Sequence, residues 1–202
     1  IIQSFSGALG VLDGGTTVVD SPVLDSGLID ENTSSEVLEM QNFQKLEETI
    51  QDYLDENQLS ESVTVLEEEA GLLLRFQDNI LFDSGSADLK PESLEIMSHI
   101  PQLLNAEDFE DKFISIEGHT DNVPMNSPRY PSNWELSVGR SSNVVRFLVE
   151  NNNMDPKRIS ASGYSEYHPV APNDNPENRA KNRRVDILIF KTIHYKDSSK
   201  NQ

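Results

Sequence analysis

The chain has 202 residues, a hydrophobic content of 36% and a formal net charge of −19. This length is sufficient for one good-sized domain and an appendage. The acidic balance, without a basic and aromatic stripe, argues against nucleic-acid binding. No cysteine is present, which excludes disulfides and cysteine metal sites. The sequence contains no run of 18 apolar residues, the length needed to cross a membrane. Because residue 1 is Ile rather than Met, we expect that an N-terminal piece, with any membrane anchor, precedes this sequence.

The charge is distributed unevenly along the chain. Residues 1–128 carry 27 acidic and 4 basic residues, whereas residues 129–191 carry 7 acidic and 10 basic residues. A locally basic segment in an otherwise acidic protein favours a negatively charged ligand at that segment. We therefore expect an anionic or carboxylate-bearing ligand in the C-terminal part.

The N-terminal third contains two helical patterns separated by a linker. Residues 1–12 have apolar side chains at helical spacing, which indicates either a frayed or self-docked end, or a helix that docks on a membrane or a partner. Residues 16–34 read as a linker rich in Asp, Gly, Ser and Thr. Residues 35–58 read as a long helix with a narrow apolar stripe. That stripe can pack on its own domain or pair with a second copy.

The rest of the chain alternates strands and helices. Residues 63–66 and 72–76 predict a strand pair with a short extension at 79–82, and Pro91 opens a helix to about residue 104. A buried strand at 112–117, a helix at 134–151, a strand at 158–161 and a final strand at 185–190 follow, with a polar turn or short helix at 173–182. This order predicts an α+β fold with a mixed sheet and helices on one face.

The residue pattern contains little that indicates a catalytic site. His119 and Asp121 could supply two metal ligands, but nothing suggests a third. No G-x-S-x-G nucleophile motif occurs, and no partner is specified for a carboxylate pair. We therefore predict a binding protein that is not an enzyme and that has no metal or cofactor.

A more specific binding site is predicted around Asp121 and Arg140. Asp121 comes just after a predicted strand and can accept hydrogen bonds from an ammonium group, whereas Arg140 can hold a carboxylate with two parallel bonds. Together they would grip a small zwitterion. The alternative is an ion pair between Asp121 and Arg140 with structural value only. A second basic cluster, residues 178–184, lies just before the final strand.

Three ordered motifs resemble the OmpA-like peptidoglycan-binding domain over residues 63–191: GHTD at 118–121, NWELSVGRS at 133–141 and NRRVDI at 182–187. The resemblance implies a βαβαβ sandwich. It also implies that Asp121 and Arg140 hold the diaminopimelate of the peptidoglycan stem peptide. The positions that would support this pocket are Thr120, Leu136, Asn182 and Arg184.

The proline-rich insertion between the first two motifs is similar to that of MotB-type flagellar stator subunits. By the same resemblance, residues 1–15 look like a plug that regulates the stator ion channel, with an apolar face formed by Ile2, Phe5, Leu9 and Leu12. A stalk helix at 35–62 and a polar tail at 192–202 would complete the chain around the domain at 63–191.

The implied function is to anchor a flagellar stator complex to the cell wall. The chain would lie on the extracytoplasmic side of the membrane as a homodimer with a MotA-like membrane partner. Two alternatives remain open: a general OmpA-like or Pal-like wall-anchoring protein outside any motor, and a wall hydrolase. The transmembrane helix that would carry ions is absent from these residues, so ion conduction cannot be read from them.

Overall fold

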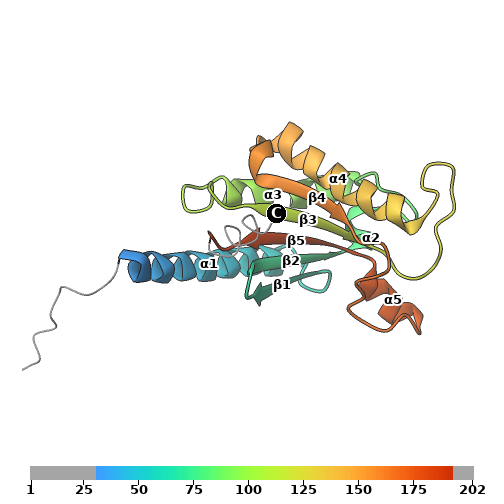
Figure 1. The fold of residues 1–202 in the computed structure, drawn as a ribbon, viewed down its shortest axis with the longest axis horizontal. Helices are drawn as coiled ribbons and strands as arrows, with labels where there is room; N and C mark the ends of the chain where they lie inside the picture. The colour runs from blue at the N-terminus through green and yellow to red at the C-terminus, as the bar shows by residue number, and fades with distance from the viewer. Residues whose placement is uncertain (1–30, 193–202) are drawn as a thin grey trace, which may run out of the picture.

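A computed structural model describes residues 31–192, with side chains from residue 35 onward. Five strands form one sheet in the order β1-β2-β5-β3-β4 (Figure 1). The strands are β1 (Val63–Glu68), β2 (Gly71–Gln77), β3 (Ile114–His119), β4 (Ile159–Gly163) and β5 (Arg184–Phe190). The helices are α1 (Glu31–Glu56), α2 (Asp78–Leu81), α3 (Pro91–Leu104), α4 (Asn133–Asn152) and α5 (Pro176–Asn182), with a 3-10 turn at Pro156–Arg158.

The sheet is mixed because the last strand enters its middle. β5 pairs antiparallel with both β2 and β3, whereas β3 and β4 are parallel and are connected through α4. Alternate residues of β5 face the helices: Val185, Ile187 and Ile189 are fully buried. This period of two is the pattern expected of a strand with one face on the core, and it confirms the predicted α+β class.

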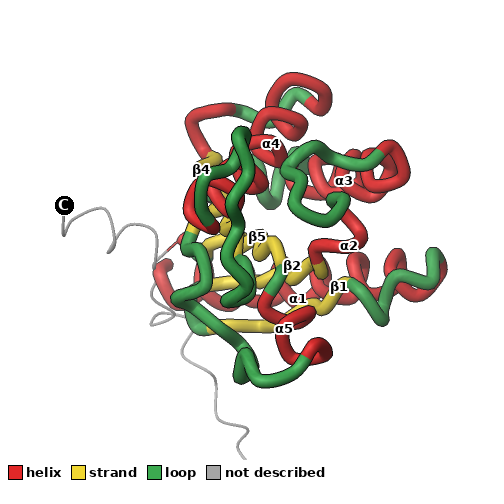
Figure 2. Tube along the Cα trace, turned by 90° about the vertical axis from the view of Figure 1, so that its right-hand side faces the viewer, coloured by secondary structure: helices red, strands yellow, loops and turns green. Residues whose placement is uncertain are grey.

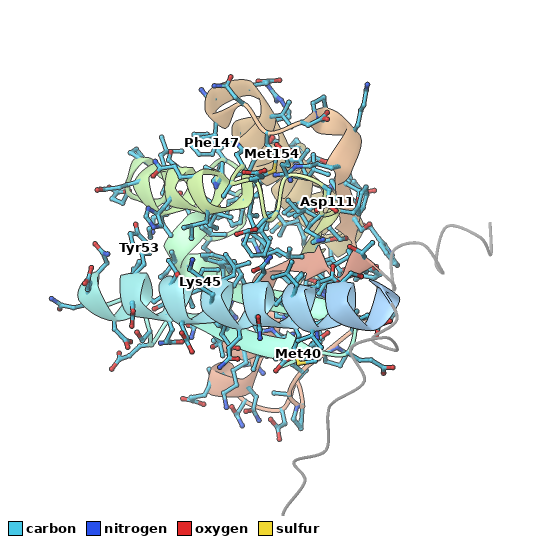
Figure 3. The ribbon with its side chains drawn as sticks, turned by 90° about the vertical axis from the view of Figure 1, so that its left-hand side faces the viewer. Met40, Lys45, Tyr53, Asp111, Phe147 and Met154 are labelled. Atoms are coloured by element: carbon cyan, nitrogen blue, oxygen red, sulfur yellow. The ribbon has the colours of Figure 1, made fainter. Side chains whose placement is uncertain are left out.

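Three helices, α1, α3 and α4, lie on the same side of the sheet and close one core (Figures 1 and 3). The apolar stripe of α1 takes part in it, since Phe43, Leu46, Ile50 and Leu54 are buried. Tyr53 on the same helix stacks on His99 of α3, with 3.7 Å between the ring centres. Of the two alternatives for this stripe, the described fold has packing on its own domain.

One predicted element is wrong. Residues 79–82 were expected to extend a strand, but Asp78–Leu81 forms the single helical turn α2, closed by the Phe82 amide donating to the Asp78 carbonyl at 2.8 Å. A short apolar run such as Ile80-Leu81-Phe82 does not distinguish a strand from a buried turn. Here the fully buried Leu81 anchors the turn in the core.

Among residues 31–192, no helix is both long and apolar enough to cross a membrane. The predicted plug, the linker up to residue 30 and the tail from residue 193 lie outside the described residues. The predicted boundaries of the plug, the linker and the tail therefore remain predictions.

Candidate ligand pocket at the end of the central strands

The register of the sheet brings three polar segments to one edge. Gln77 at the end of β2 and His119 at the end of β3 both pair with Arg184, the first residue of β5. Asp78, Asp121 and Arg183 lie just beyond these three strand ends, so the pairing gathers them although they are up to 105 positions apart in sequence. Figure 2 views this end of the molecule, where α2, α5 and long loops surround the sheet.

Helix α4 brings Arg140 to the same edge. Ser132 caps the helix in a capping box with Glu135, which fixes its first turn. The helix then packs tightly on β3, because a Cβ added to Gly118 would lie 2.1 Å from the carbonyl oxygen of Ser137. The small Ser137 and Ser141, both fully buried, allow this close approach as predicted.

The four charged side chains form a chain of alternating sign. Arg183 Nη1 donates to Asp121 Oδ2 at 2.7 Å, and its Nε lies 3.4 Å from Asp78 Oδ2. Arg140 Nη2 lies 3.2 Å from the same Asp78 oxygen. The direct ion pair between Asp121 and Arg140, the alternative raised from the sequence, is replaced by pairs with Arg183 and Asp78.

Arg140 is nearly fully buried, with 1% of its surface exposed, yet it is incompletely paired. Its Nε donates to the carbonyl oxygen of Ser86 at 3.0 Å, and its guanidinium carbon lies 5.1 Å from the ring centre of Phe82. Among residues 31–192, its Nη1 has no hydrogen-bond partner. An unpaired buried donor is costly, so a ligand oxygen at Nη1 would relieve that cost.

Burial dominates the protonation of this cluster. It raises the pKa of Asp78, although the charges of Arg140 and Arg183 oppose the shift, and it lowers the pKa of Arg140, opposed by Asp78. For Arg183 burial also acts to lower the pKa, but the hydrogen bond to Asp121 and the charge of Asp78 raise it overall. The cluster therefore holds charges in a site where water hydrates them poorly.

A cavity of about 570 Å³ opens beside these charges. Thr120, Asp121, Leu136 and Arg140, four of the six residues predicted for the ligand pocket, line it. The remaining lining residues are Asp78, Asn79, Phe82, Asp83, Ser84, Gly85, Lys90, Val123, Pro124, Met125, Asn133 and Arg183. The cavity thus offers acidic and basic groups side by side, which suits a ligand with both charges.

Asn182 and Arg184 do not line the cavity. The amide of Asn182 accepts from the backbone of Val170 and Ala171 and donates to the Ala171 carbonyl, so it braces the loop before α5. Arg184 points away and pairs with Asp186 at 2.9 Å. They flank Arg183, and any support that they give to the pocket acts through that residue.

Two pocket residues, Asp78 and Arg183, were missed from the sequence. Asp78 carries the same signal as Asp121, since each carboxylate comes just after a strand. Arg183 was noted only as part of a basic run. Neighbouring residues in an extended chain point to opposite sides. At the start of β5 Arg184 points away from the cavity, so Arg183 points towards it.

The fold and the cavity define an α+β domain of the OmpA type. The OmpA family model matches residues 81–183, and the chain belongs to this family, in its motility protein B group. It is 37% identical over 204 residues to motility protein B of Bacillus subtilis, covering 93% of this chain and 75% of that protein. It is 34% identical to motility protein B of Helicobacter pylori strain J99, covering 62% of this chain but about half of the relative, 49%.

Solved structures agree with this assignment. A putative MotB-like protein from Desulfovibrio vulgaris superposes with a TM-score of 0.67 at 28% identity, over 76% of this chain and 91% of that one. The cell wall anchor of the T6SS from Pseudomonas aeruginosa gives 0.62 at 32% identity, over 69% and 94%. The periplasmic domain of Helicobacter pylori MotB gives 0.61 at 26% identity, over 69% and 88%. The family and fold predicted from the motifs are confirmed.

Proposed function

We propose that this chain binds the diaminopimelate-containing stem peptide of peptidoglycan and thereby anchors a flagellar stator complex to the cell wall. The observation that carries the proposal is the Nη1 of Arg140, which has no partner among the described residues and is buried beside a cavity that is also lined by the carboxylates of Asp78, Asp83 and Asp121. A free amino acid end, with its ammonium and carboxylate on one carbon, matches this pair of opposite charges.

In the proposed complex Arg140 donates from Nη1 to the ligand carboxylate. Asp121 accepts from the ammonium, using the oxygens that now contact Arg183 and the amide of Val123. Asp78 pairs with Nη2 of Arg140 and keeps the guanidinium in position. Charge-assisted hydrogen bonds contribute about 1.5–3 kcal/mol each, so three or four of them are needed to supply the roughly 8 kcal/mol of micromolar capture.

The wall-anchoring and motor roles are supported by the relatives, which are named motility protein B in two organisms and a cell wall anchor in a third. We propose that the chain acts on the extracytoplasmic side of the membrane, as a homodimer with a MotA-like membrane subunit. Residues 1–15, including Ile2, Phe5, Leu9 and Leu12, would form a plug that limits ion flow before assembly. None of the relatives reported above is named as an enzyme, and binding without turnover is the proposal.

Co-sedimentation with purified peptidoglycan tests the pocket. Arg140→Ala and Asp121→Asn should each weaken binding by at least about tenfold, the equivalent of one charge-assisted bond. Arg146→Ala is a matched control, because Arg146 lies on the same helix but is exposed, with an exposed partner, Glu150. Parent-like pelleting of both pocket variants would refute the pocket. Release of soluble muropeptides would instead support a wall hydrolase.

The motor role is tested separately in cells that carry the full-length protein. Deletion of residues 1–12 should increase ion leakage and slow growth, since the proposed plug would be lost. Unchanged leakage and growth would remove the plug from the proposal. A monomeric assembly without a membrane partner would favour a general OmpA-like or Pal-like anchor outside a motor.

A further inference from the structure

Two exposed aromatic side chains form a stacked pair beside the ligand pocket. The rings of Trp134 and Tyr167 lie 5.4 Å apart between centres, with 26° between their planes. Trp134 is 47% exposed and Tyr167 is 64% exposed, so much of both rings remains in contact with solvent. Large aromatic surface left in water at one spot indicates a binding surface more often than a scattered exposed residue does.

The fold holds both rings on well-anchored backbone. Trp134 lies in the first turn of α4, within the capping box of Ser132 and Glu135, and its amide donates to Ser132 Oγ at 3.2 Å. Tyr167 belongs to the turn that follows β4. The buried Ser165 holds this turn, since its amide donates to Ser137 Oγ at 3.1 Å and its carbonyl accepts from the Thr120 amide at 2.9 Å. The pair is therefore preorganised, which lowers the entropy lost when a ligand binds.

The aromatic pair is continuous with the stem-peptide pocket. Trp134 and Tyr167 line a smaller cavity of about 150 Å³, which shares Pro124, Met125 and Asn133 with the larger one. The Asn133 side chain lies between the two, because its Nδ2 donates both to the Asp121 carbonyl and to Glu166 Oε2. A ligand that fills the first cavity would therefore have its attached groups within reach of the aromatic pair.

We infer that Trp134 and Tyr167 bind a neutral pyranose sugar of the glycan strand to which the stem peptide is attached, an inference that rests on the proposed function. The C–H face of a pyranose carries partial positive charge and stacks on the negative face of an aromatic ring. Ser132, Ser165 and Glu166 provide polar groups at the rim of the same cavity. The carboxylate of Glu166 can accept hydrogen bonds from sugar hydroxyls, and it disfavours an anionic sugar by like-charge repulsion.

The contiguity of the two cavities and the polar rim separate a sugar from the other possible occupants. A protein partner or a second copy of the chain could also cover aromatic rings. A protein partner or a second copy has no reason to bind next to a pocket for a charged amino acid end. A sugar attached to the stem peptide must lie near that pocket. The glycan is thus the occupant that the two cavities together favour.

Trp134 is the single tryptophan of the chain and reports on its own environment by fluorescence. The full chain is titrated with two probes: a diaminopimelate-containing tripeptide without sugar, and the same peptide on an N-acetylglucosamine–N-acetylmuramic acid disaccharide. The disaccharide-peptide should bind about three- to tenfold more tightly, as expected for one aromatic stacking contact. Only this probe should also shift or quench the tryptophan emission.

Variants then assign the effect to the rings, with affinity measured by calorimetry. Tyr167→Ala and Trp134→Ala should abolish the advantage of the disaccharide-peptide and leave the affinity for the bare peptide unchanged. Trp134→Phe should retain part of the advantage. Met40→Ala is the control, since Met40 is an exposed apolar residue on α1 that lines neither cavity. Thermal unfolding of every variant verifies the fold.

Equal affinity of the parent protein for both probes would overturn the inference. So would an equal loss of affinity for both probes in the aromatic variants. An emission change that depends on protein concentration alone would also overturn it, because it would mark a second copy of the chain as the occupant. The proposed function fails separately. If the bare peptide does not bind but the disaccharide probe still shifts the emission of Trp134, the assignment of the peptide pocket is wrong and the sugar site at Trp134 and Tyr167 is retained.

Discussion

Two clusters of charged side chains lie on opposite sides of the chain at residues 183 and 184, and they differ in whether the group that lacks a partner lines the large cavity. The pocket cluster contains Asp78, Asp121, Arg140 and Arg183. The sheet-face cluster lies on the side of the sheet away from the helices. It contains Arg75, His119, Arg184 and Asp186.

The carboxylate and guanidinium groups of the sheet-face cluster satisfy one another. Asp186 accepts two hydrogen bonds from Arg75, at 2.9 and 2.8 Å, and a third from Arg184 at 2.9 Å. Arg184 also donates to the carbonyl of His168 at 3.1 Å. Burial alone would raise the pKa of Asp186, but these hydrogen bonds and charges lower it overall.

In the pocket cluster burial has the opposite result for the central carboxylate, since the pKa of Asp78 is raised. One donor of Arg140 is left without a partner, and a cavity adjoins it. Residue types alone therefore do not separate a structural ion network from a binding site. Nor does an unpaired atom alone, because both ring nitrogens of His119 in the sheet-face cluster also lack hydrogen-bond partners among the described residues. The cavity that Arg140 lines, and His119 does not, makes the difference.

The largest expected effect is on the sheet face. Asp186→Ala should lower the free energy of unfolding by about 3–5 kcal/mol, because it leaves the buried charge of Arg184 unpaired. Asp78→Ala also removes the carboxylate partner of the buried Arg140, but it should cost less, because the raised pKa of Asp78 means that burial outweighs its attraction to the arginines, so the variant also relieves an unfavourable burial. Urea denaturation measures both. An equal loss in the two variants would erase the energetic difference between the clusters.

The sharpest comparison uses the adjacent arginines. Arg183→Ala should weaken peptidoglycan binding by about 1.5–3 kcal/mol, because Asp121 loses the guanidinium that orients it. Arg184→Ala should instead lower the stability by about 1–3 kcal/mol and leave binding by the folded protein intact. Pelleting assays and denaturation of the same two samples measure both quantities. Reversed effects would mean that the sheet-face cluster, and not the cavity, binds the ligand.

Gly118→Ala tests whether the pocket depends on the close approach of α4. The new Cβ would lie 2.1 Å from the backbone oxygen of Ser137, so the helix that carries Arg140 must move. We expect a loss of about 1–3 kcal/mol in stability, together with weaker binding. Gly139→Ala is the control, because its Cβ would meet side-chain atoms at 3.2 Å. Retained binding in Gly118→Ala would show that the pocket tolerates this shift.

The smallest effect concerns His119, which stacks on Tyr164 and whose Nε2 lies 3.8 Å from both Glu117 and Asp186. Burial lowers the pKa of His119 below 6.5, opposed by Glu117 and helped by the charge of Arg184. Below about pH 6.5 the unfolded chain therefore binds a proton that the folded protein resists, and stability falls with a slope of at most about 1.4 kcal/mol per pH unit. This contribution is fully present above pH 6.5.

His119→Phe should keep the ring stacking and remove that contribution to the slope. Denaturation at pH 7.5, 6.5 and 5.5 compares the variant with the parent. Parallel pH profiles would show that the pKa of His119 does not differ between the folded and unfolded states.

Periodicity and local chemistry determined most of the fold from sequence alone. Pro91 marked the start of α3, the capping box at Ser132 marked the start of α4, and the alternation in residues 185–190 marked the buried final strand. Each signal acts within a few residues, where local sterics and hydrogen bonding dominate. The short run at 79–82 was missed because its apolar pattern fits two conformations.

The sequence also determined the family and two of the charged pocket residues, since Asp121 and Arg140 lie in ordered motifs. Only the tertiary structure decided their partners. Asp78, Arg183 and the Tyr167 ring reach the site from distant segments, through the antiparallel register of β2, β5 and β3 and through the loop after β4. Pairing across 65 to 119 positions depends on packing of the whole sheet, and no local pattern in the chain encodes it.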